Sequence, residues 1–348
     1  MITRNRKFFL ITTCAVVVAV ITSLGIVREI RKPTPIPDYQ ISERASETTV
    51  IIPEGASGNQ IGQILFEAGI VKSARAFFAA ATANPKSQSI QPGTYQIEQR
   101  IPGAQAVLQL LDRNRRVLVL LIREGERAYE LQDDLINLKF KKTDIEDVFE
   151  AKVSVPGFGE QGVEGFLFPA TYNLLPADTL GSVKGRLLQK FTEVIDEIDF
   201  VDRAKLLDLT PYEALIIASI VQAEGFDERD FGKVARVIYN RMKVKMPLQM
   251  DSTVLYALKE RRIAVTNRDI NIASSYNTYN RRGLPPTPIG NPGKKALEAT
   301  LAPESGNWLY FVTVAPTQTK FTDSYAEFLT FKREFQRNLK AGLFEAKP

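Results

Sequence analysis

Histidine is absent from this chain of 348 residues, and cysteine occurs only once, at Cys14. The absence of histidine excludes Ser-His-Asp and Cys-His triads, and it excludes histidine-ligated metal sites. A single cysteine excludes an intrachain disulfide and a cysteine metal cluster. Any acid–base catalysis would therefore fall to Asp, Glu, Lys or Tyr side chains, and we expect neither a metal nor a cofactor.

The chain also lacks a strong charge imbalance. Its 45 basic and 40 acidic residues make it only mildly cationic, and no basic run is interleaved with aromatic residues as on a nucleic-acid-binding surface. We therefore expect no nucleic-acid partner. The composition supports no more than a weak preference for anionic polymers or membrane surfaces.

One long apolar run is present, at the N-terminus. Basic residues at positions 4, 6 and 7 precede a mostly apolar run over residues 8–27, which is long enough to cross a bilayer as a helix. No small-x-small cleavage motif clearly follows, so we predict an uncleaved single-pass anchor in the cytoplasmic (inner) membrane at residues 1–30. Basic residues also follow the run, so the Lys/Arg balance alone does not fix the orientation. A body outside the cytoplasm is favoured because no second span follows, and a cleaved signal peptide is the alternative.

The rest of the chain predicts an α+β fold in two parts, which suits its length. A proline-containing, semi-extended linker is expected first, and then a small module of alternating short strands and helices. Within the larger mixed α+β domain we expect a buried strand at 308–314 and a closing helix at 324–339. The predicted boundaries are 31–47 for the linker, 48–115 for the module, 116–159 for a connecting region and 160–342 for the larger domain.

Residues 210–225 predict a buried helix that carries a carboxylate at its end. Thr210 and Glu213 form a capping-box pattern, a proline occupies the first helical position, and Gly225 is expected to end the helix. The residues between are apolar on nearly every face, which indicates a helix inside a core. Partial burial and the negative end of the helix dipole would raise the pKa of Glu224, as a general acid at neutral pH requires. The alternative is an ordinary solvated glutamate, and the residues alone leave both open.

Other candidate site residues are expected in loops or at helix ends. Glu164 lies in an aromatic and glycine-rich segment, where it either contributes to a site or is solvated. Asp251 or Ser252 is expected to cap the next helix, and Asp251 is alternatively catalytic. The polar and aromatic segment 274–280 precedes a Gly- and Pro-rich loop at 283–293 that cannot be helix or central strand. Tyr rings with amide and hydroxyl neighbours suit stacking and hydrogen bonding to a sugar, but a structured surface loop is the alternative.

Six segments, taken in order, resemble the endolytic murein transglycosylases of the MltG or YceG-like type. The segments are EGFLFP (164–169), ASIVQAE (218–224), NR (240–241), LQMDSTV (248–254), YNTY (276–279) and GLPP (283–286). Six ordered motifs are far more specific than any one alone, and the resemblance covers about residues 48–340. It implies that the module at 48–115 is a LysM-like subdomain and that 160–342 is a YceG-like catalytic domain.

The resemblance implies a peptidoglycan lyase. Its substrate would be the β-1,4 bond between N-acetylmuramic acid and N-acetylglucosamine in nascent glycan strands, and its products would be 1,6-anhydro ends that terminate strand elongation. The family's catalytic glutamate, which donates a proton and then takes one back, falls on Glu224. Substrate positioning would fall on five further residues, namely Gln249, Asp251, Tyr276, Asn277 and Tyr279. The implied partners are peptidoglycan strands, the cytoplasmic membrane and peptidoglycan synthases of the elongation machinery.

Three positions depart from the family pattern. Gln222 stands where many members have an acid, which favours the helix-terminal glutamate as the essential carboxylate. Lys320 and Phe328 stand where members commonly carry histidine, so any role of those histidines is absent or replaced.

Two alternative functions stay open. One is a hydrolytic muramidase, which needs a second carboxylate such as Asp251 or Glu164, and the other is a non-catalytic peptidoglycan-binding or scaffold protein.

Overall fold

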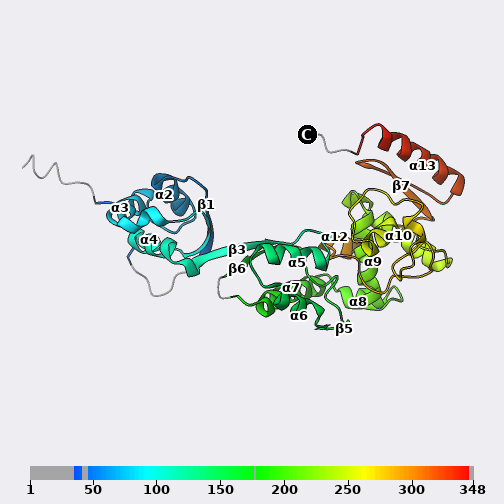
Figure 1. The fold of residues 1–348 in the computed structure, drawn as a ribbon, viewed down its shortest axis with the longest axis horizontal. Coiled ribbons are helices and arrows are strands. Elements are labelled where there is room, and N and C mark those ends of the chain that lie inside the picture. The colour runs from blue at the N-terminus through cyan, green and yellow to red at the C-terminus, as the bar shows by residue number, and fades with distance from the viewer. Residues whose placement is uncertain (1–34, 41–45, 176–177, 345–348) are drawn as a thin grey trace, which may run out of the picture. The chain divides into compact units, whose positions relative to one another are not determined.

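The computed structural model describes residues 35–40, 46–175 and 178–344. Helices and short strands are mixed along these residues, which confirms the α+β class (Figure 1). The chain divides into two compact units, Met1–Arg116 and Val117–Pro348. The predicted membrane anchor lies outside the described residues. Within the described ranges, no helix is long and apolar enough to cross a membrane.

The first unit packs two antiparallel strands and three α-helices around one core. Val50 of the first strand lies opposite Tyr95 of the second, and both side chains point inward. Leu65, Phe77 and Ile97 are fully buried beside them. The elements are β1 (Glu47–Ile52), α2 (Gly58–Glu67), α3 (Ala74–Ala83), η1 (Pro85–Ser89), β2 (Gly93–Glu98), α4 (Gly103–Leu111) and η2 (Arg113–Arg115).

The second unit is larger and mostly helical, with short antiparallel strand pairs. Its pairs are β3 with β6, β4 with β5, and β7 with β8. The elements are β3 (Arg116–Leu121), α5 (Ala128–Asn137), α6 (Lys142–Glu150), β4 (Val153–Val155), β5 (Gly159–Gln161), β6 (Thr171–Leu174), α7 (Leu180–Glu197), α8 (Phe200–Lys205), α9 (Pro211–Glu224), η3 (Glu228–Asp230), α10 (Phe231–Lys243), α11 (Asp251–Ala257), η4 (Asp269–Asn271), α12 (Lys294–Leu301), β7 (Tyr310–Ala315), β8 (Gln318–Thr322) and α13 (Tyr325–Lys340).

Helix α9 is the centre of this unit because opposite sides of it are buried in different clusters. Leu215 and Ala218 belong to an apolar cluster that also contains side chains of α5 and α7. Ile217 and Ile220 belong to another, formed with α10, α12 and the segment before α11. All four side chains are fully buried. The apolar pattern on every face of this helix therefore correctly predicted a core helix.

The region predicted as connecting, residues 116–159, belongs to the second unit from Val117 onward and contributes to its main core. Leu120, Leu131 and Phe149 are buried in the same cluster as the residues of α7. The aromatic and glycine-rich segment that contains Glu164 forms a buried turn, and the strand β6 begins only at Thr171. The side chains of this turn are apolar because a core surrounds them. A short apolar run of sequence does not distinguish such a turn from a strand.

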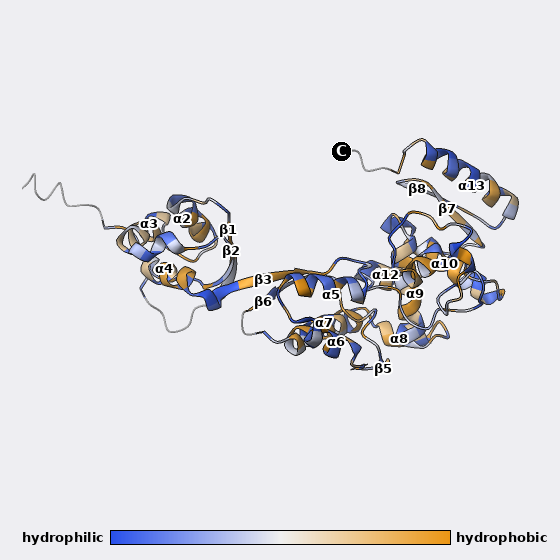
Figure 2. Cartoon of the chain, viewed as in Figure 1, coloured by the Kyte–Doolittle hydropathy of each residue, from blue (hydrophilic) through white to orange (hydrophobic). Residues whose placement is uncertain are grey.

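The C-terminal ribbon is more exposed than the sequence predicted. The strand expected to be buried at 308–314 begins at Tyr310, and only Val314 within it is fully buried. The reason is that β7 and β8 form a separate two-stranded pair, which has two open edges. Helix α13 packs on β7 but has no fully buried side chain, and most of its visible surface in Figure 2 is hydrophilic.

Candidate active site

Helix α9 ends at Glu224, where the chain packs closely against the start of the next helix, α10. At its start, Thr210 Oγ1 accepts the backbone N–H of Glu213 at 3.2 Å, and the Glu213 carboxylate accepts the Thr210 N–H at 2.8 Å, so the predicted capping box is confirmed. At its end, Gly225 has φ −78°, which any residue adopts. A Cβ atom at Gly225 would lie 2.3 Å from the ring of Phe231. The prediction that Gly225 ends the helix is confirmed, and glycine is needed here for close packing and not for a left-handed conformation.

The carboxyl group of Glu224 has a raised pKa. Its Oε1 accepts the backbone N–H of Ser252 at 3.0 Å. Burial of the carboxyl group is the main cause that raises its pKa to about 7, and the negative charge of Asp251 adds to the effect. Hydrogen bonding from Ser252 and the positive charge of Arg241 act in the opposite direction. The residue as a whole keeps intermediate exposure, so the carboxyl group is desolvated by its neighbours while the site stays accessible. Near pH 7 the group is both a usable acid and a usable base.

Asp251 is the first residue of α11 and does not cap it. The N-cap position belongs to Met250, which makes no side-chain capping bond, so the predicted capping role is wrong. Asp251 Oδ1 instead accepts the hydroxyl of Tyr279, and Oδ2 accepts the N–H of Val265 at 3.5 Å. Burial raises the pKa of Tyr279 above its usual value, and the charges of Asp251 and Glu224 raise it further. Glu224, Asp251 and Tyr279 therefore form one electrostatic cluster.

Gln249 lies two residues before Asp251 in a strained backbone conformation. Its φ is +48°, in the left-handed region that residues other than glycine rarely adopt. Two hydrogen bonds to Thr278, each 3.0 Å long, hold this conformation. The Gln249 N–H donates to the carbonyl oxygen of Thr278, and the Met250 N–H donates to its Oγ1. Gln249 is exposed. The strain therefore holds a polar side chain at the surface close to Asp251.

The two remaining predicted binding residues are placed differently from each other. Asn277 is only 1% exposed. Its Nδ2 donates to two backbone carbonyls of the 270–272 turn at 3.0 and 2.9 Å, and its Oδ1 accepts the Tyr279 N–H at 3.0 Å. The amide of Asn277 is therefore engaged within the loop that carries Tyr279, and its predicted part in substrate positioning stays a prediction. Tyr276 is half-buried, and its hydroxyl shares a hydrogen bond with Thr287 at 2.8 Å.

Glu164, the other candidate carboxylate, is buried in a structural role. Both of its oxygens lie within hydrogen-bond distance of the Ala128 N–H, at 3.1 and 3.2 Å, and Oε2 accepts the hydroxyl of Tyr256 at 2.9 Å. Burial is the main cause that raises the pKa of Glu164 to about 7. These bonds join the start of α5 to α11. Glu164 thus supports the helix that begins at Asp251.

Arg241, which the site prediction missed, is a buried cation next to the cluster of Glu224, Asp251 and Tyr279. It is 5% exposed, its Nε donates to the carbonyl of Leu309 at 2.6 Å, and its Nη1 donates to the carbonyl of Leu248. Its guanidinium lies 5.6 Å from the ring centre of Tyr310. Its position in the NR motif at the end of an amphipathic helix was the available signal. It holds both the segment before α11 and the start of β7.

Asn291 is a second residue whose importance the sequence did not indicate. It is fully buried, and its Oδ1 accepts the N–H groups of Gly165 and Leu167 at 3.0 Å each. Its Nδ2 donates to the carbonyl of Glu126 at 2.8 Å. One side chain therefore joins the 283–293 loop, the EGFLFP segment and the loop before α5. The Gly- and Pro-rich composition of its loop predicted rigidity but not these partners.

The three positions that depart from the family pattern make structural contacts. Gln222 Oε1 accepts the Gly293 N–H at 3.0 Å, which joins the end of α9 to the start of α12. Lys320 forms an ion pair with Glu334 at 2.8 Å, and the ring of Phe328 stacks on Tyr310 with the ring centres 5.1 Å apart. The last two contacts fasten α13 to the β7–β8 ribbon.

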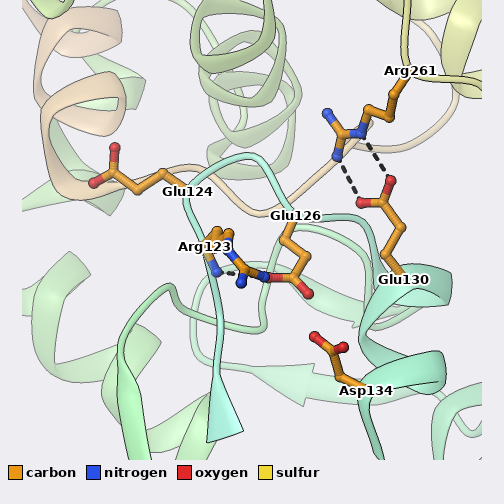
Figure 3. A pocket seen from close by; sticks show the side chains of 6 residues that line it. All are labelled: Arg123, Glu124, Glu126, Glu130, Asp134 and Arg261. Atoms are coloured by element: carbon orange, nitrogen blue, oxygen red, sulfur yellow. Dashed lines mark hydrogen bonds and ion pairs between the residues drawn. The ribbon is translucent and has the colours of Figure 1, made fainter. Parts of the chain in front are cut away.

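An acidic hollow of about 400 Å³ lies elsewhere in this unit (Figure 3). Arg261 forms two hydrogen bonds with Glu130, at 2.8 and 2.7 Å, and the Arg123 N–H donates to Glu126 at 2.6 Å. Burial raises the pKa of Glu126, with the charge of Asp134 a smaller cause. None of the predicted site residues lines this hollow. In the part of the chain that the structure describes, no cluster of acidic residues could hold a metal ion.

Comparison with known proteins identifies relatives along most of the chain. A model of the YceG-like family matches residues 50–334. A protein of Bacillus subtilis (strain 168) named endolytic murein transglycosylase is 30% identical over 321 residues, which are 84% of this chain and 86% of that protein. A protein of the same name from Streptococcus pneumoniae serotype 2 is 30% identical over 299 residues, which are 76% of this chain and 54% of that protein.

A solved structure is similar as well. The crystal structure of a protein from Listeria monocytogenes described as yceG-like superimposes with a TM-score of 0.58 at 26% sequence identity. The match covers 82% of this chain and 98% of that chain. The similarity to these proteins therefore extends over both units and includes the cluster around Glu224.

Proposed function

The chain belongs to the YceG-like family, and from this premise we propose that it is an endolytic lytic transglycosylase of peptidoglycan. It cleaves the β-1,4 bond between N-acetylmuramic acid and N-acetylglucosamine in nascent glycan strands and leaves 1,6-anhydro ends. The observation that carries the proposal is the Glu224 carboxyl group, which lies at the end of a rigid core helix and has its pKa raised to about 7. The names of the relatives from Bacillus and Streptococcus agree with it.

One carboxyl group performs both proton transfers in this mechanism. Protonated Glu224 gives its proton to the glycosidic oxygen as the bond from that oxygen to C1 of the muramoyl sugar breaks. The resulting carboxylate then takes the proton of the muramoyl 6-hydroxyl while that oxygen bonds to C1. No water is consumed, and Glu224 is protonated again at the end. A pKa near the working pH suits a group that must act in both directions.

The neighbours of Glu224 are better suited to positioning than to attack. A hydrolytic muramidase requires a second carboxylate that activates water or attacks the sugar. Asp251 accepts hydrogen bonds from Tyr279 and Val265, and Glu164 accepts them from Ala128 and Tyr256. Both carboxylates are therefore engaged with the protein. We assign substrate positioning to Asp251 and to the residues predicted with it, which are Gln249, Tyr276, Asn277 and Tyr279.

The sequence supports a location for this activity. The apolar run at residues 8–27 anchors the chain in the cytoplasmic membrane by a single helix, and the linker carries the folded units outside the cytoplasm. Residues 48–115 of the first unit serve as a LysM-like subdomain. A membrane-anchored enzyme of this kind would act on strands as they are made, so it would terminate elongation and work beside peptidoglycan synthases.

The products of cleavage test the proposal directly. The purified full-length chain, incubated with uncrosslinked glycan strands, should release fragments with anhydro ends, and mass spectrometry should find them lighter by one water than hydrolytic fragments. This follows from closure by the 6-hydroxyl instead of attack by water. Strands treated with a hydrolytic muramidase supply the heavier reference fragments. Fragments with hydrolytic ends would overturn the lytic mechanism in favour of a muramidase.

Asp251 should set the pH range of the reaction. Replacing Asp251 with Asn removes the negative charge that helps to raise the pKa of Glu224, so the pKa should fall. Since the first step needs protonated Glu224, the decline of kcat/KM at alkaline pH should move to lower pH, by up to about one unit. Asp227→Asn is the matched control, because Asp227 is paired with Arg229, and it should leave the decline in place. An alkaline decline that moves upward in the Asp251 variant would contradict this account.

A further inference from the structure

The hydroxyl of Ser252 is buried and unsatisfied beside the Glu224 carboxyl group. Ser252 is 9% exposed, and its backbone N–H already donates to Glu224 Oε1 at 3.0 Å. Its Oγ has no hydrogen-bond partner, and in the described part of the chain Arg186 Nε is the other buried side-chain polar atom in this condition. A buried polar group without a partner is destabilising. An unsatisfied hydroxyl at this place therefore calls for a functional explanation.

Neighbouring buried hydroxyl groups are satisfied, so the case of Ser252 is not general. Thr253, the next residue, donates to the Met250 carbonyl at 2.7 Å and shares a second bond with Thr278 at 2.9 Å. Ser219 on α9 donates to the Ile216 carbonyl at 2.7 Å and accepts a backbone N–H at 3.0 Å. The fold pairs these hydroxyls and leaves only that of Ser252 free next to the reactive carboxyl group.

We propose that the Ser252 hydroxyl is a hydrogen-bond donor reserved for the ionised state of Glu224. Together with its own backbone N–H, it would form a two-point cradle for the carboxylate that exists between the two proton transfers. The inference rests on the proposed role of Glu224 as the single acid and base. It makes Ser252 a positioning residue, because it acts on the substrate only through Glu224.

The geometry fits a donor that engages only when charge appears. The hydroxyl lies close enough to the carboxyl group to lower the pKa of Glu224, although its oxygen is not in hydrogen-bonding geometry with any partner in this structure. A small rotation of the serine side chain about its Cα–Cβ bond moves the oxygen itself, and side-chain rotations are far faster than turnover. Hydrogen bonds to an ionised acceptor are roughly twice as strong as those between neutral groups. The bond is therefore strongest in the state that the reaction must stabilise.

The proton balance through the cycle is closed. Glu224 first loses its proton to the leaving oxygen, and the Ser252 hydroxyl then turns and donates to the new carboxylate while keeping its own proton. When the muramoyl 6-hydroxyl transfers its proton to Glu224, the carboxyl group becomes neutral and the Ser252 hydroxyl is released. No oxidant, metal or water molecule takes part. Ser252 stabilises the charged intermediate state and is itself unchanged.

Replacing Ser252 with Ala should shift the pH profile as well as the rate. Without this donor the ionised form of Glu224 is less stable, so its pKa rises and the alkaline decline of kcat/KM moves to higher pH by about one unit. The maximal rate should fall roughly tenfold, as expected for a lost hydrogen bond to a charged group. Loss of packing alone would lower the rate but leave the midpoint of the decline in place.

Three variants complete the experiment. Ser252→Thr keeps a hydroxyl and should keep the wild-type midpoint, and Ser252→Cys, a weaker donor of similar size, should give a smaller upward shift and serves if the Ala variant does not fold. Thr253→Val removes the neighbouring hydroxyl and should lower thermal stability without moving the midpoint. An unshifted midpoint in the Ala or Cys variant overturns the role of Ser252. Glu224→Gln, measured alongside, separates the two proposals, because retained cleavage there would overturn the role of Glu224 itself.

Discussion

Replacing Glu224 with Gln should abolish glycan cleavage, with kcat/KM falling by at least about a thousandfold. The amide keeps the size of the side chain and can still accept the Ser252 N–H bond, but it neither donates an acidic proton nor accepts one. Because one carboxyl group serves both steps of the proposed mechanism, both fail together. Release of anhydro fragments by the purified full-length chain, followed by mass spectrometry, measures the loss.

Glu213→Gln is the matched control for this substitution. Glu213 lies on the same helix, at its first turn, where it completes the capping box with Thr210. Glutamine serves the same position in a capping box, so both stability and cleavage should stay close to wild type. Equal loss in the two variants would mean that α9 had been damaged as a whole.

The stability of the Glu224→Gln variant tests the raised pKa of Glu224 independently of cleavage. The pKa of Glu224 is raised from 4.5 to about 7 in the folded chain, so between these values the folded state holds a proton that the unfolded state has lost. Wild-type stability therefore falls as pH rises through this window, and the variant lacks this contribution. At pH 8 it should be more stable than wild type by roughly 1–3 kcal/mol, while at pH 4 the two should be similar. Glu164 contributes the same trend to both proteins, so the difference isolates Glu224.

Cleavage that persists in the Glu224→Gln variant would contradict the assignment of Glu224 as the catalytic residue. Peptidoglycan binding with no cleavage by wild type or variant would instead favour a non-catalytic scaffold. A pull-down with insoluble peptidoglycan, together with the cleavage assay, distinguishes these cases, and urea unfolding at both pH values shows that the variant is folded. Intact binding with lost cleavage is the expected outcome, because the positioning residues on the neighbouring loops are unchanged.

The parts of the fold that the sequence predicted well have local causes. The start of α9 was readable because a capping box requires only Thr210 and Glu213, three residues apart. Its burial was readable because apolar residues occupy every face over 14 residues. Glu224 could be placed at its end for the same reason. The family resemblance then supplied a substrate that no local pattern contained.

The rest of the site depends on contacts between segments far apart in the chain. The Ser252 N–H bond to Glu224 joins residues 28 positions apart, and the Asn291 bond to Gly165 joins residues 126 apart. Loop residues have no periodicity from which such partners could be inferred. For this reason the sequence predicted a capping role for Asp251, and it did not indicate the bonds that Asn277 makes within its own loop. Both are polar residues whose roles are set by the orientation of the chain around them.

Asn291→Ala should cause the largest loss of stability of any single amide substitution in this loop system. It leaves the N–H groups of Gly165 and Leu167 buried without an acceptor, and it removes one donor from the Glu126 carbonyl. Each unsatisfied buried group is costly, so the free energy of unfolding should fall by about 3–5 kcal/mol. Urea denaturation measures it. Asn280→Ala is the control, since Asn280 is exposed and makes one side-chain bond at 3.2 Å, and its effect should stay within about 0.5 kcal/mol.

Asn291→Asp separates the acceptor function of this side chain from its donor function. A carboxyl group at this position still accepts from Gly165 and Leu167, but only its protonated form can donate to the Glu126 carbonyl. Burial should raise its folded pKa above the unfolded value, so the variant should approach wild-type stability at low pH and lose stability as pH rises through the folded pKa. Urea denaturation at pH 5 and pH 8, with wild type beside it, checks this dependence. Stability close to wild type at both pH values would mean that the donor bond to Glu126 contributes little, and that Asn291 holds the three loops together through its acceptor oxygen alone.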